Sequence, residues 1–188
     1  MRSIEIWKKR PNFSGTGSRG KLAEFKADFV NKFITENKIE SIIDFGCGDL
    51  QNASLLKVKK YLGIDIVEHT HPDNVLSDTF ETVVSRFDLF ENTEKADLSL
   101  CMDVLYHILE DEQEYLKSTL DKIIKYTKKY FIIYAQDSYQ SDKVFNFHNH
   151  LFNCPWRQIL ETKNVRLIDE QKKCQPGSAA RFFVYEKL

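Results

Sequence analysis

No apolar run in the 188 residues approaches the length of a membrane-spanning helix, and the opening stretch MRSIEIWKKRPNFSG lacks the apolar core of a signal peptide. We therefore expect a cytoplasmic protein without a membrane partner. Charge of neither sign is in excess, because 27 basic and 28 acidic residues leave a net charge of -1. A surface that binds nucleic acid would be basic, so we expect no nucleic-acid partner.

Cysteine and metal-binding patterns are also scarce. The four cysteines are scattered without any CxxC pair, which favours reduced, buried thiols over disulfides or metal ligands. Two histidine pairs, His69 with His71 and His148 with His150, lack a third ligand at a useful spacing. We therefore expect no metal ion.

The chain has neither internal repeats nor low-complexity segments, and its 14 Phe and 8 Tyr give it too much apolar aromatic mass for a disordered protein. Its length suits one domain with a sizeable core. We predict a single domain over residues 1–188, with an amino-terminal arm at residues 1–20 and a substrate-side insertion at residues 136–163.

Helices and strands alternate through most of the sequence. Apolar residues at steps of three and four predict a helix over residues 22–34, and the charge order over residues 110–129 predicts a second. Shorter helices are expected near residues 52–57 and 156–161, and no regular structure in SGTGSRG. Unbroken apolar runs predict strands at SIIDF, YLGIDIV, residues 82–87, ADLSLCM, YFIIYA, VRLIDEQ and RFFVYEKL.

This alternation predicts an α/β fold, in which helices cover both faces of a parallel sheet. Such sheets bind ligands beyond the carboxyl ends of their strands. We therefore expect the site to follow the strand ends at Phe45, Asp65, Phe87, Met102 and Ala135.

The stretch SIIDFGCGDLQ places two glycines directly after a predicted strand. Gly46 and Gly48 remove side chains where the strand turns, so a ligand can lie against the backbone. A dinucleotide-binding loop would have a third glycine where this chain has Gln51, and a P-loop would have Lys followed by Ser or Thr. A tight turn without any ligand is the alternative that this stretch leaves open.

Acidic residues at the ends of neighbouring strands favour a nucleoside ligand. Asp65 ends the second strand, where a carboxylate can accept hydrogen bonds from both ribose hydroxyls. Asp88 in RFDLF follows the third strand and could accept a hydrogen bond from an adenine amino group. With Asp44 at the end of the first strand, these residues predict a nucleoside site along one edge of the sheet.

The motifs SIIDFGCGD, YLGIDIV, RFDLF and ADLSLCMDVLYHILEDE together resemble the class I S-adenosylmethionine-dependent methyltransferases over residues 20–135. The glycine-rich lead-in and DVLYH are similar to those of small members encoded in bacterial surface-polysaccharide clusters. The resemblance implies a Rossmann-like, doubly wound, seven-stranded, mostly parallel sheet whose last strand is antiparallel and inserted beside the fifth. It also implies S-adenosyl-L-methionine as cofactor, a small molecule or sugar as acceptor, and surface-polysaccharide biosynthesis as the setting.

The same resemblance implies which residues contact the cofactor. The glycine loop would hold its methionine and sugar end, the end of the second strand its ribose, and the stretch after the third strand its adenine. The residues so implied are Asp44, Gly46, Gly48, Asp65, Ile66, Asp88, Leu89, Phe90, Met102, Asp103 and Val104. Leu50 departs from the family pattern, which commonly has a third glycine there.

Methyl transfer requires the acceptor to be aligned with the methyl group, and a hydroxyl acceptor also needs a base. His107 in DVLYHI is the candidate base, and the adjacent Tyr106 is a second candidate catalytic residue. The alternatives are a histidine bonded to backbone and a tyrosine in the core. Substrate recognition is expected from the arm and from the segment after Ala135, through Trp7, Arg19, Gln136 and His148.

Two other functions stay open from the sequence. A nucleotide-dependent oxidoreductase would use the same sheet edge, although Gln51 disfavours it. A non-catalytic nucleoside-binding module would keep the cofactor residues without turning over an acceptor.

Overall fold

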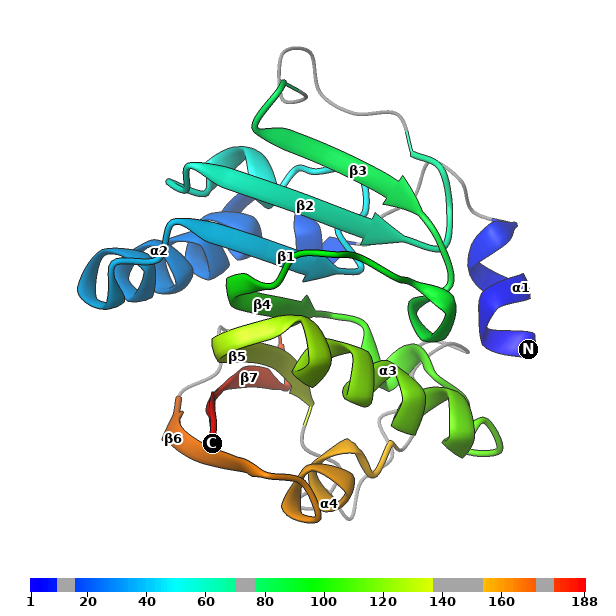
Figure 1. Cartoon of the computed structure of the whole chain (residues 1–188). Coiled ribbons are helices and arrows are strands. Elements are labelled where there is room, and N and C mark those ends of the chain that lie inside the picture. Colours follow the sequence, from blue (N-terminus) through cyan, green and yellow to red (C-terminus); the bar gives the residue numbers. More distant parts are fainter. Residues whose placement is uncertain (10–15, 70–76, 137–153, 172–177) are drawn as a thin grey trace.

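The computed structural model describes residues 1–9, 16–69, 77–136, 154–171 and 178–188. Its centre is a seven-stranded sheet with the strand order β3-β2-β1-β4-β5-β7-β6 (Figure 1). The strands are β1 (Ser41–Phe45), β2 (Lys60–Asp65), β3 (Phe80–Val84), β4 (Ala96–Met102), β5 (Thr127–Gln136), β6 (Val165–Glu170) and β7 (Ala180–Lys187). The helices are α1 (Arg2–Lys8), α2 (Gly20–Asn37), α3 (Gln113–Tyr126) and α4 (Trp156–Glu161), with 3-10 turns η1 (Thr16–Ser18), η2 (Ala53–Leu55), η3 (Phe87–Leu89) and η4 (Leu105–His107).

The strand directions follow the predicted topology. β1 pairs in parallel with β2 and β4, and the parallel pairing continues to β3 on one side and β5 on the other. β7 is inserted between β5 and β6 and is antiparallel to both. The predicted Rossmann-like, seven-stranded α/β fold with an antiparallel last strand is confirmed, and its strand order reverses between β1 and β4, where such folds bind ligands.

Helix α2 covers one face of the sheet. The small residues Ala23 and Ala27 lie on its buried side. The predicted apolar stripe lies at the margin of this contact, where Phe29 stacks on Phe182 of β7 with 3.9 Å between ring centroids. The fully buried line of α2 is Ala23, Lys26, Ala27, Val30 and Ile34.

Helices α3 and α4 cover the other face (Figure 1). The predicted core residues of α3, Leu116, Leu120 and Ile123, are buried in the cluster that also contains Phe131 and Phe183. Trp156 of α4 packs on Phe183 with 4.9 Å between ring centroids. The sheet is therefore apolar on both faces, which accounts for the unbroken apolar runs in its strands.

Several predicted boundaries were wrong. The third strand ends at Val84, and Phe87 belongs to η3. Residues 128 and 129 belong to β5, because α3 ends at Tyr126. SGTGSRG, for which no regular structure was expected, contains η1.

The sequence reasoning missed α1. Its seven residues gain their stability from tertiary contacts, since Ile4 is buried in the core cluster and the Ser3 N–H donates to Glu112 Oε1 at 3.2 Å. Helices this short are marginal in isolation, so local sequence gives little signal for them.

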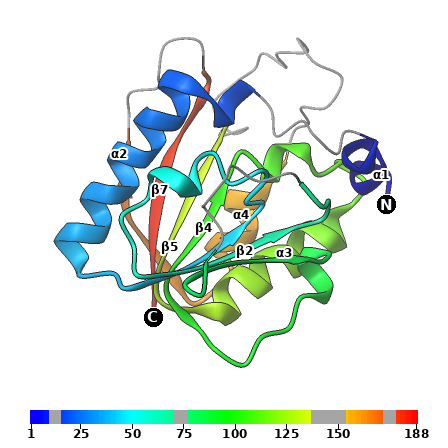
Figure 2. The ribbon, with the colours of Figure 1, turned by 90° about the horizontal axis from the view of Figure 1, so that it is seen from above.

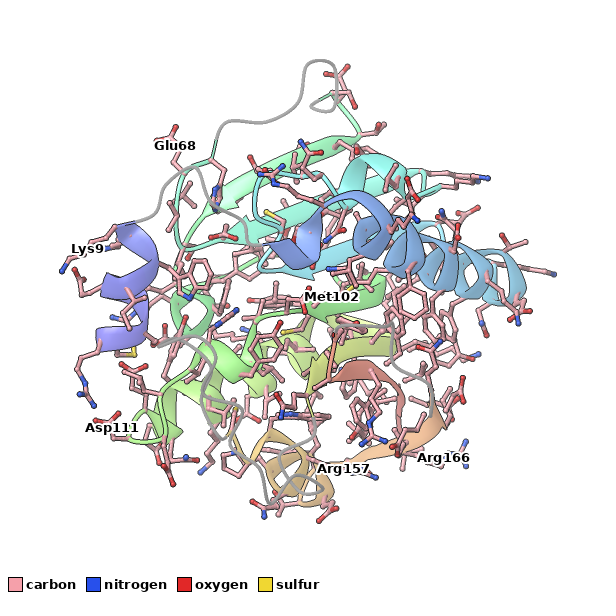
Figure 3. All side chains as sticks on the ribbon, turned by 180° about the vertical axis from the view of Figure 1, so that it is seen from behind. Lys9, Glu68, Met102, Asp111, Arg157 and Arg166 are labelled. Atoms are coloured by element: carbon pink, nitrogen blue, oxygen red, sulfur yellow. The ribbon has the colours of Figure 1, made fainter. Side chains whose placement is uncertain are left out.

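The carboxyl ends of β1, β2 and β3 point toward the side of the molecule where α1 lies (Figure 1). Seen from above, α1 and α2 lie at opposite ends of the molecule (Figure 2). Lys9 after α1 and Glu68 after β2 lie on the same side in the view from behind (Figure 3). None of the described helices combines the length and the apolar character that crossing a membrane requires.

Candidate active site at the carboxyl ends of the strands

The glycine loop turns sharply after β1. Gly46 and Gly48 have φ values of 93° and 55°, a backbone conformation that side chains disfavour. The Gly46 N–H donates to the Ile64 carbonyl at 2.7 Å, which ties the loop to β2. A Cβ on Gly46 would lie 2.2 Å from Val104 Cγ2, so the bare backbone also makes room for the segment after β4.

Leu50 keeps the left-handed turn at the position where the family pattern commonly has glycine. Its φ is 63°, and its N–H donates to the Cys47 carbonyl at 3.3 Å. The side chain is fully buried in the cluster beneath α2. Burial of the leucine side chain offsets the cost of this backbone conformation.

Asp44 is buried at the end of β1. The Tyr61 hydroxyl donates to Asp44 Oδ2 at 2.7 Å, whereas none of the described residues gives Asp44 Oδ1 a hydrogen-bond partner. Burial raises the pKa of Asp44 to about 6, against the Tyr61 hydrogen bond and the Lys26 charge, which lower it. A buried carboxylate oxygen without a donor is a place where a ligand donor fits.

Asp65 joins the end of β2 to the glycine loop. Its Oδ2 accepts the Gly48 N–H at 2.9 Å, and its Oδ1 accepts the Val67 N–H at 3.1 Å. His69 Nε2 lies 3.5 Å from Asp65 Oδ1. The structure therefore brings Asp44, the two loop glycines and Asp65 together, as the sequence predicted.

Gly63 of β2 admits two site side chains at once. A Cβ there would lie 2.7 Å from Cys47 Sγ and 3.1 Å from Tyr61 Cε1. Because Gly63 has no side chain, the Tyr61 ring can pass over it and reach Asp44 on the neighbouring strand β1. Sequence reasoning did not assign Tyr61 to the site, because nothing local marks a strand tyrosine as the partner of a distant acid.

The residues predicted to flank adenine are dispersed around η3. Asp88 is held by Arg86, whose Nε and Nη2 donate to its two oxygens at 3.0 and 2.6 Å. Leu89 is 63% exposed, whereas Phe90 is buried in the core with its ring centroid 5.1 Å from that of Tyr126. Ile66 is partly buried beyond β2. A cofactor role for these residues stays a prediction. The two hydrogen bonds from Arg86 to Asp88 were not predicted from the sequence.

The end of β4 carries a second polar cluster. Met102 is buried below α2 (Figure 3), and the next residue, Asp103, has a φ of 59°. Asp103 Oδ2 accepts from Lys26 Nζ at 2.5 Å, and Asp103 Oδ1 accepts from the Tyr106 hydroxyl at 2.5 Å. Lys26 was missed, although a lysine at a core-facing position of a helix is a signal in its own right.

An aromatic group lies beyond this cluster. The His107 ring meets Trp7 of α1 edge-on with 4.7 Å between centroids and Tyr106 with 4.5 Å. Burial and the Asp103 carboxylate raise the pKa of Tyr106 well above its ordinary value, so its hydroxyl remains a donor at neutral pH. The structure thus joins both predicted catalytic residues to a predicted substrate residue. Their roles stay predictions.

The other predicted substrate residues are not part of the aromatic group formed by Trp7, Tyr106 and His107. Arg19 donates from Nη2 to Asp49 Oδ2 of the glycine loop at 2.7 Å. Gln136 ends β5, and its carbonyl accepts from Trp156 Nε1 at 3.3 Å. His148 lies outside the described residues. Within the described part of the chain, no three His, Cys, Asp or Glu side chains lie together as potential metal ligands.

No protein-family model and no curated protein matches the chain, but solved structures do. Magnesium protoporphyrin IX methyltransferase from Synechocystis PCC 6803 with bound SAM superposes with a TM-score of 0.72 at 12% identity, over 100% of this chain and 98% of that one. N-methyltransferase NodS from Bradyrhizobium japonicum WM9, in complex with S-adenosyl-L-homocysteine, gives 0.68 at 15% identity over 99% and 97%.

The small RNA methyltransferase HEN1 gives a TM-score of 0.62 at 18% identity, over 90% of this chain and 26% of that one. At these identities the likeness shows the fold. The chain therefore has the Rossmann-like fold that these methyltransferases share.

Proposed function

We propose that this protein is an S-adenosylmethionine-dependent methyltransferase that acts on a small molecule or sugar. The observation that carries the proposal is Asp44, a buried acid whose Oδ1 lacks a partner among the described residues, beside the glycine loop. Asp65, at the neighbouring strand end, adds a carboxylate at the place where a ribose would lie.

The residues present fit this cofactor. Asp44 would accept a donor from its methionine end, the backbone at Gly46 and Gly48 would lie against it, and Asp65 would accept from the ribose hydroxyls. Asp88, oriented by Arg86, would accept from the adenine amino group. When bound, the cofactor supplies a methyl group on a positively charged sulfur.

The chain's own residues would align the acceptor and move its proton. His107 would take the proton of a hydroxyl acceptor, held in place by Trp7 and Tyr106. Tyr106, whose hydroxyl donates its proton to the hydrogen bond with Asp103, would accept a hydrogen bond from the acceptor or orient His107. The Trp7 ring would pack on the apolar face of a sugar.

The acceptor class rests on charge and on the sequence resemblance. The similar structures include enzymes named for a porphyrin and for small RNA, so fold does not choose between acceptors. A net charge of -1 provides no general attraction for a polyanion, which favours a small acceptor. DVLYH and the glycine-rich lead-in support a place in surface-polysaccharide biosynthesis.

Ligand-induced stabilisation tests the cofactor. S-adenosylmethionine and S-adenosylhomocysteine should each raise the melting temperature, because a ligand that binds only the folded state stabilises it by mass action. NAD should raise it much less, and an equal or larger shift with NAD would favour the oxidoreductase alternative. Thermal scans at matched ligand concentrations make the comparison.

Asp65→Ala should weaken S-adenosylhomocysteine binding by roughly tenfold or more, because charged hydrogen bonds contribute about 1.5–3 kcal/mol each. Isothermal titration measures the affinity. Asp28→Ala on the exposed side of α2 is the matched control and should bind like the native protein. Unchanged affinity in the Asp65 variant would remove this residue from the site.

A further inference from the structure

Lys26 of α2 is a buried lysine to which the proposed reaction assigns no task. Its side chain is 1% exposed, and its ammonium lies 2.5 Å from Asp103 Oδ2. Removing such a charge from water is costly, and a buried ion pair is often no more stabilising than apolar side chains of similar volume. Stability alone therefore does not explain a lysine at this position, whereas the contacts of Asp103 do.

Asp103 is held in an unfavourable backbone conformation directly after β4. Its φ is 59°, and its N–H donates to the Tyr134 carbonyl at 2.9 Å. A non-glycine residue keeps such a conformation only where its surroundings impose it, and such residues concentrate at functional sites. Lys26 and Tyr106 are the side chains that hold the Asp103 carboxylate, one on each oxygen.

The position of Asp103 determines the positions of two other parts of the site. Val104, the next residue, fills the space beside Gly46, where a Cβ would lie 2.2 Å from Val104 Cγ2. On another side, the arm lies against the carboxylate, since a Cβ on Gly17 would lie 2.9 Å from Asp103 Oδ2. Asp103 thus connects the glycine loop and the arm to the end of β4.

Lys26 also acts on Asp44. Burial raises the pKa of Asp44, and the Lys26 charge opposes that rise. The other titratable groups facing Asp44 are Tyr61 and Asp65 from β2 and the thiols of Cys47 and Cys101. Among the charges that act on Asp44, Lys26 is the positive one, and it also pairs with Asp103. Lys26 is therefore the shared counter-ion of Asp44, near the end of β1, and Asp103, directly after β4.

We propose that Lys26 is a positioning residue of the methyl-transfer site. It holds Asp103, and through Asp103 it fixes Tyr106 and the packing of Val104 on the glycine loop in the arrangement that binds the cofactor. This inference rests on the proposed function, because the ligand whose binding it supports is the cofactor proposed above.

Lys26→Met tests the proposal, since methionine has a similar length without the charge. The probe is S-adenosylhomocysteine, with its affinity measured by isothermal titration between pH 5.5 and 8. We expect about tenfold weaker binding at pH 7, the effect of losing one charged hydrogen bond from the site. The pH below which affinity falls should also move upward, because Asp44 loses the cation that favours its ionised form.

Lys32→Met is the matched control. It removes a lysine from the same helix, but this lysine is 74% exposed and makes a long surface ion pair with Glu36, with 3.8 Å between nitrogen and oxygen. Its affinity and pH profile should match those of the native protein. An equal loss in both variants would assign the effect to α2 in general and overturn the proposal.

The double variant Lys26→Met with Asp103→Asn separates a positioning role from a structural one, even where the single variant folds poorly. It removes both charges of the Lys26–Asp103 pair, so the Asp103 carboxylate is not left without its cation, and the free energy of unfolding in urea should return toward the native value. S-adenosylhomocysteine affinity should stay weakened and its pH profile shifted.

Recovery of affinity together with stability would make Lys26 merely structural, as would native affinity in the single variant. No binding by the native protein would instead overturn the proposed function, and this inference with it.

Discussion

Asp44 has opposite effects on stability and on the proposed function. Its pKa rises from an ordinary 3.8 to about 6, first because of burial. An acid whose pKa is higher in the folded chain than in the unfolded chain binds its proton more tightly when folded. The free energy of unfolding that this group contributes is therefore greatest below about pH 4 and falls as the pH rises through 6.

Asp44→Asn should remove the fall in the free energy of unfolding that ionisation of Asp44 causes as the pH rises. The ligand-free variant should be more stable than the native protein at pH 7, by about 3 kcal/mol, and the advantage should shrink toward pH 4. Urea unfolding at both pH values measures the difference, with the exposed Asp28→Asn as control. The same substitution should weaken S-adenosylhomocysteine binding, since the carboxylate is lost. A stability difference that does not depend on pH would contradict this account.

Asp44 and Asp65 were predictable at this scale because each lies at the end of a strand with a clear apolar pattern. Asp44 is the penultimate residue of β1 and Asp65 is the last residue of β2, and neighbouring parallel strands bring their ends together. Lys26 was not foreseen, because its partner Asp103 lies 77 positions away in the sequence. Local patterns say that a lysine is out of place in a core-facing row, but not what it meets.

The role of helix α1 follows from its contacts with the segments after β4. The helix docks through Ser3 on Glu112 and places Trp7 against His107, while the glycine loop and Asp65 lie outside it. Its role should therefore concern the acceptor far more than the cofactor.

Deletion of residues 1–9 should reduce methylation of the native acceptor much more than S-adenosylhomocysteine affinity. Turnover is measured as methylated product from a small-molecule cell extract by mass spectrometry, and affinity by isothermal titration. Arg2→Ala is the control, because Arg2 is 73% exposed and pairs with Asp111 at the surface. Equal losses of turnover and affinity would show that α1 supports the whole site rather than the acceptor side.

The predictability of the elements follows their length and their dependence on distant contacts. α2 and the seven strands were found because their apolar patterns are long or unbroken, while β3 was misplaced because its edge position leaves Val83 and Val84 exposed. α1 and η1 were missed because both are short, and α1 depends on contacts with residues near Glu112.

At the scale of the whole molecule, the balance of charge bears on the acceptor. With 27 basic and 28 acidic residues, the protein should methylate compounds from a small-molecule extract and not tRNA or duplex RNA. Transfer of a labelled methyl group to each class, at low and at moderate salt, makes the comparison. Efficient, saturable methylation of RNA would contradict the prediction of a small acceptor.

The packing of Val104 on Gly46 also bears on how this protein can be recombined with others of its fold. Residues 46, 63 and 104 are distant in sequence, yet each leaves or fills space for a neighbour, Gly63 for Cys47 and Gly46 for Val104. A chimaera that exchanges only the glycine loop would bring in a loop that is shaped to pack against a different residue at position 104. The smallest interchangeable unit therefore runs from β1 through the segment after β4, and hybrid libraries with crossovers inside it should be depleted of working enzymes.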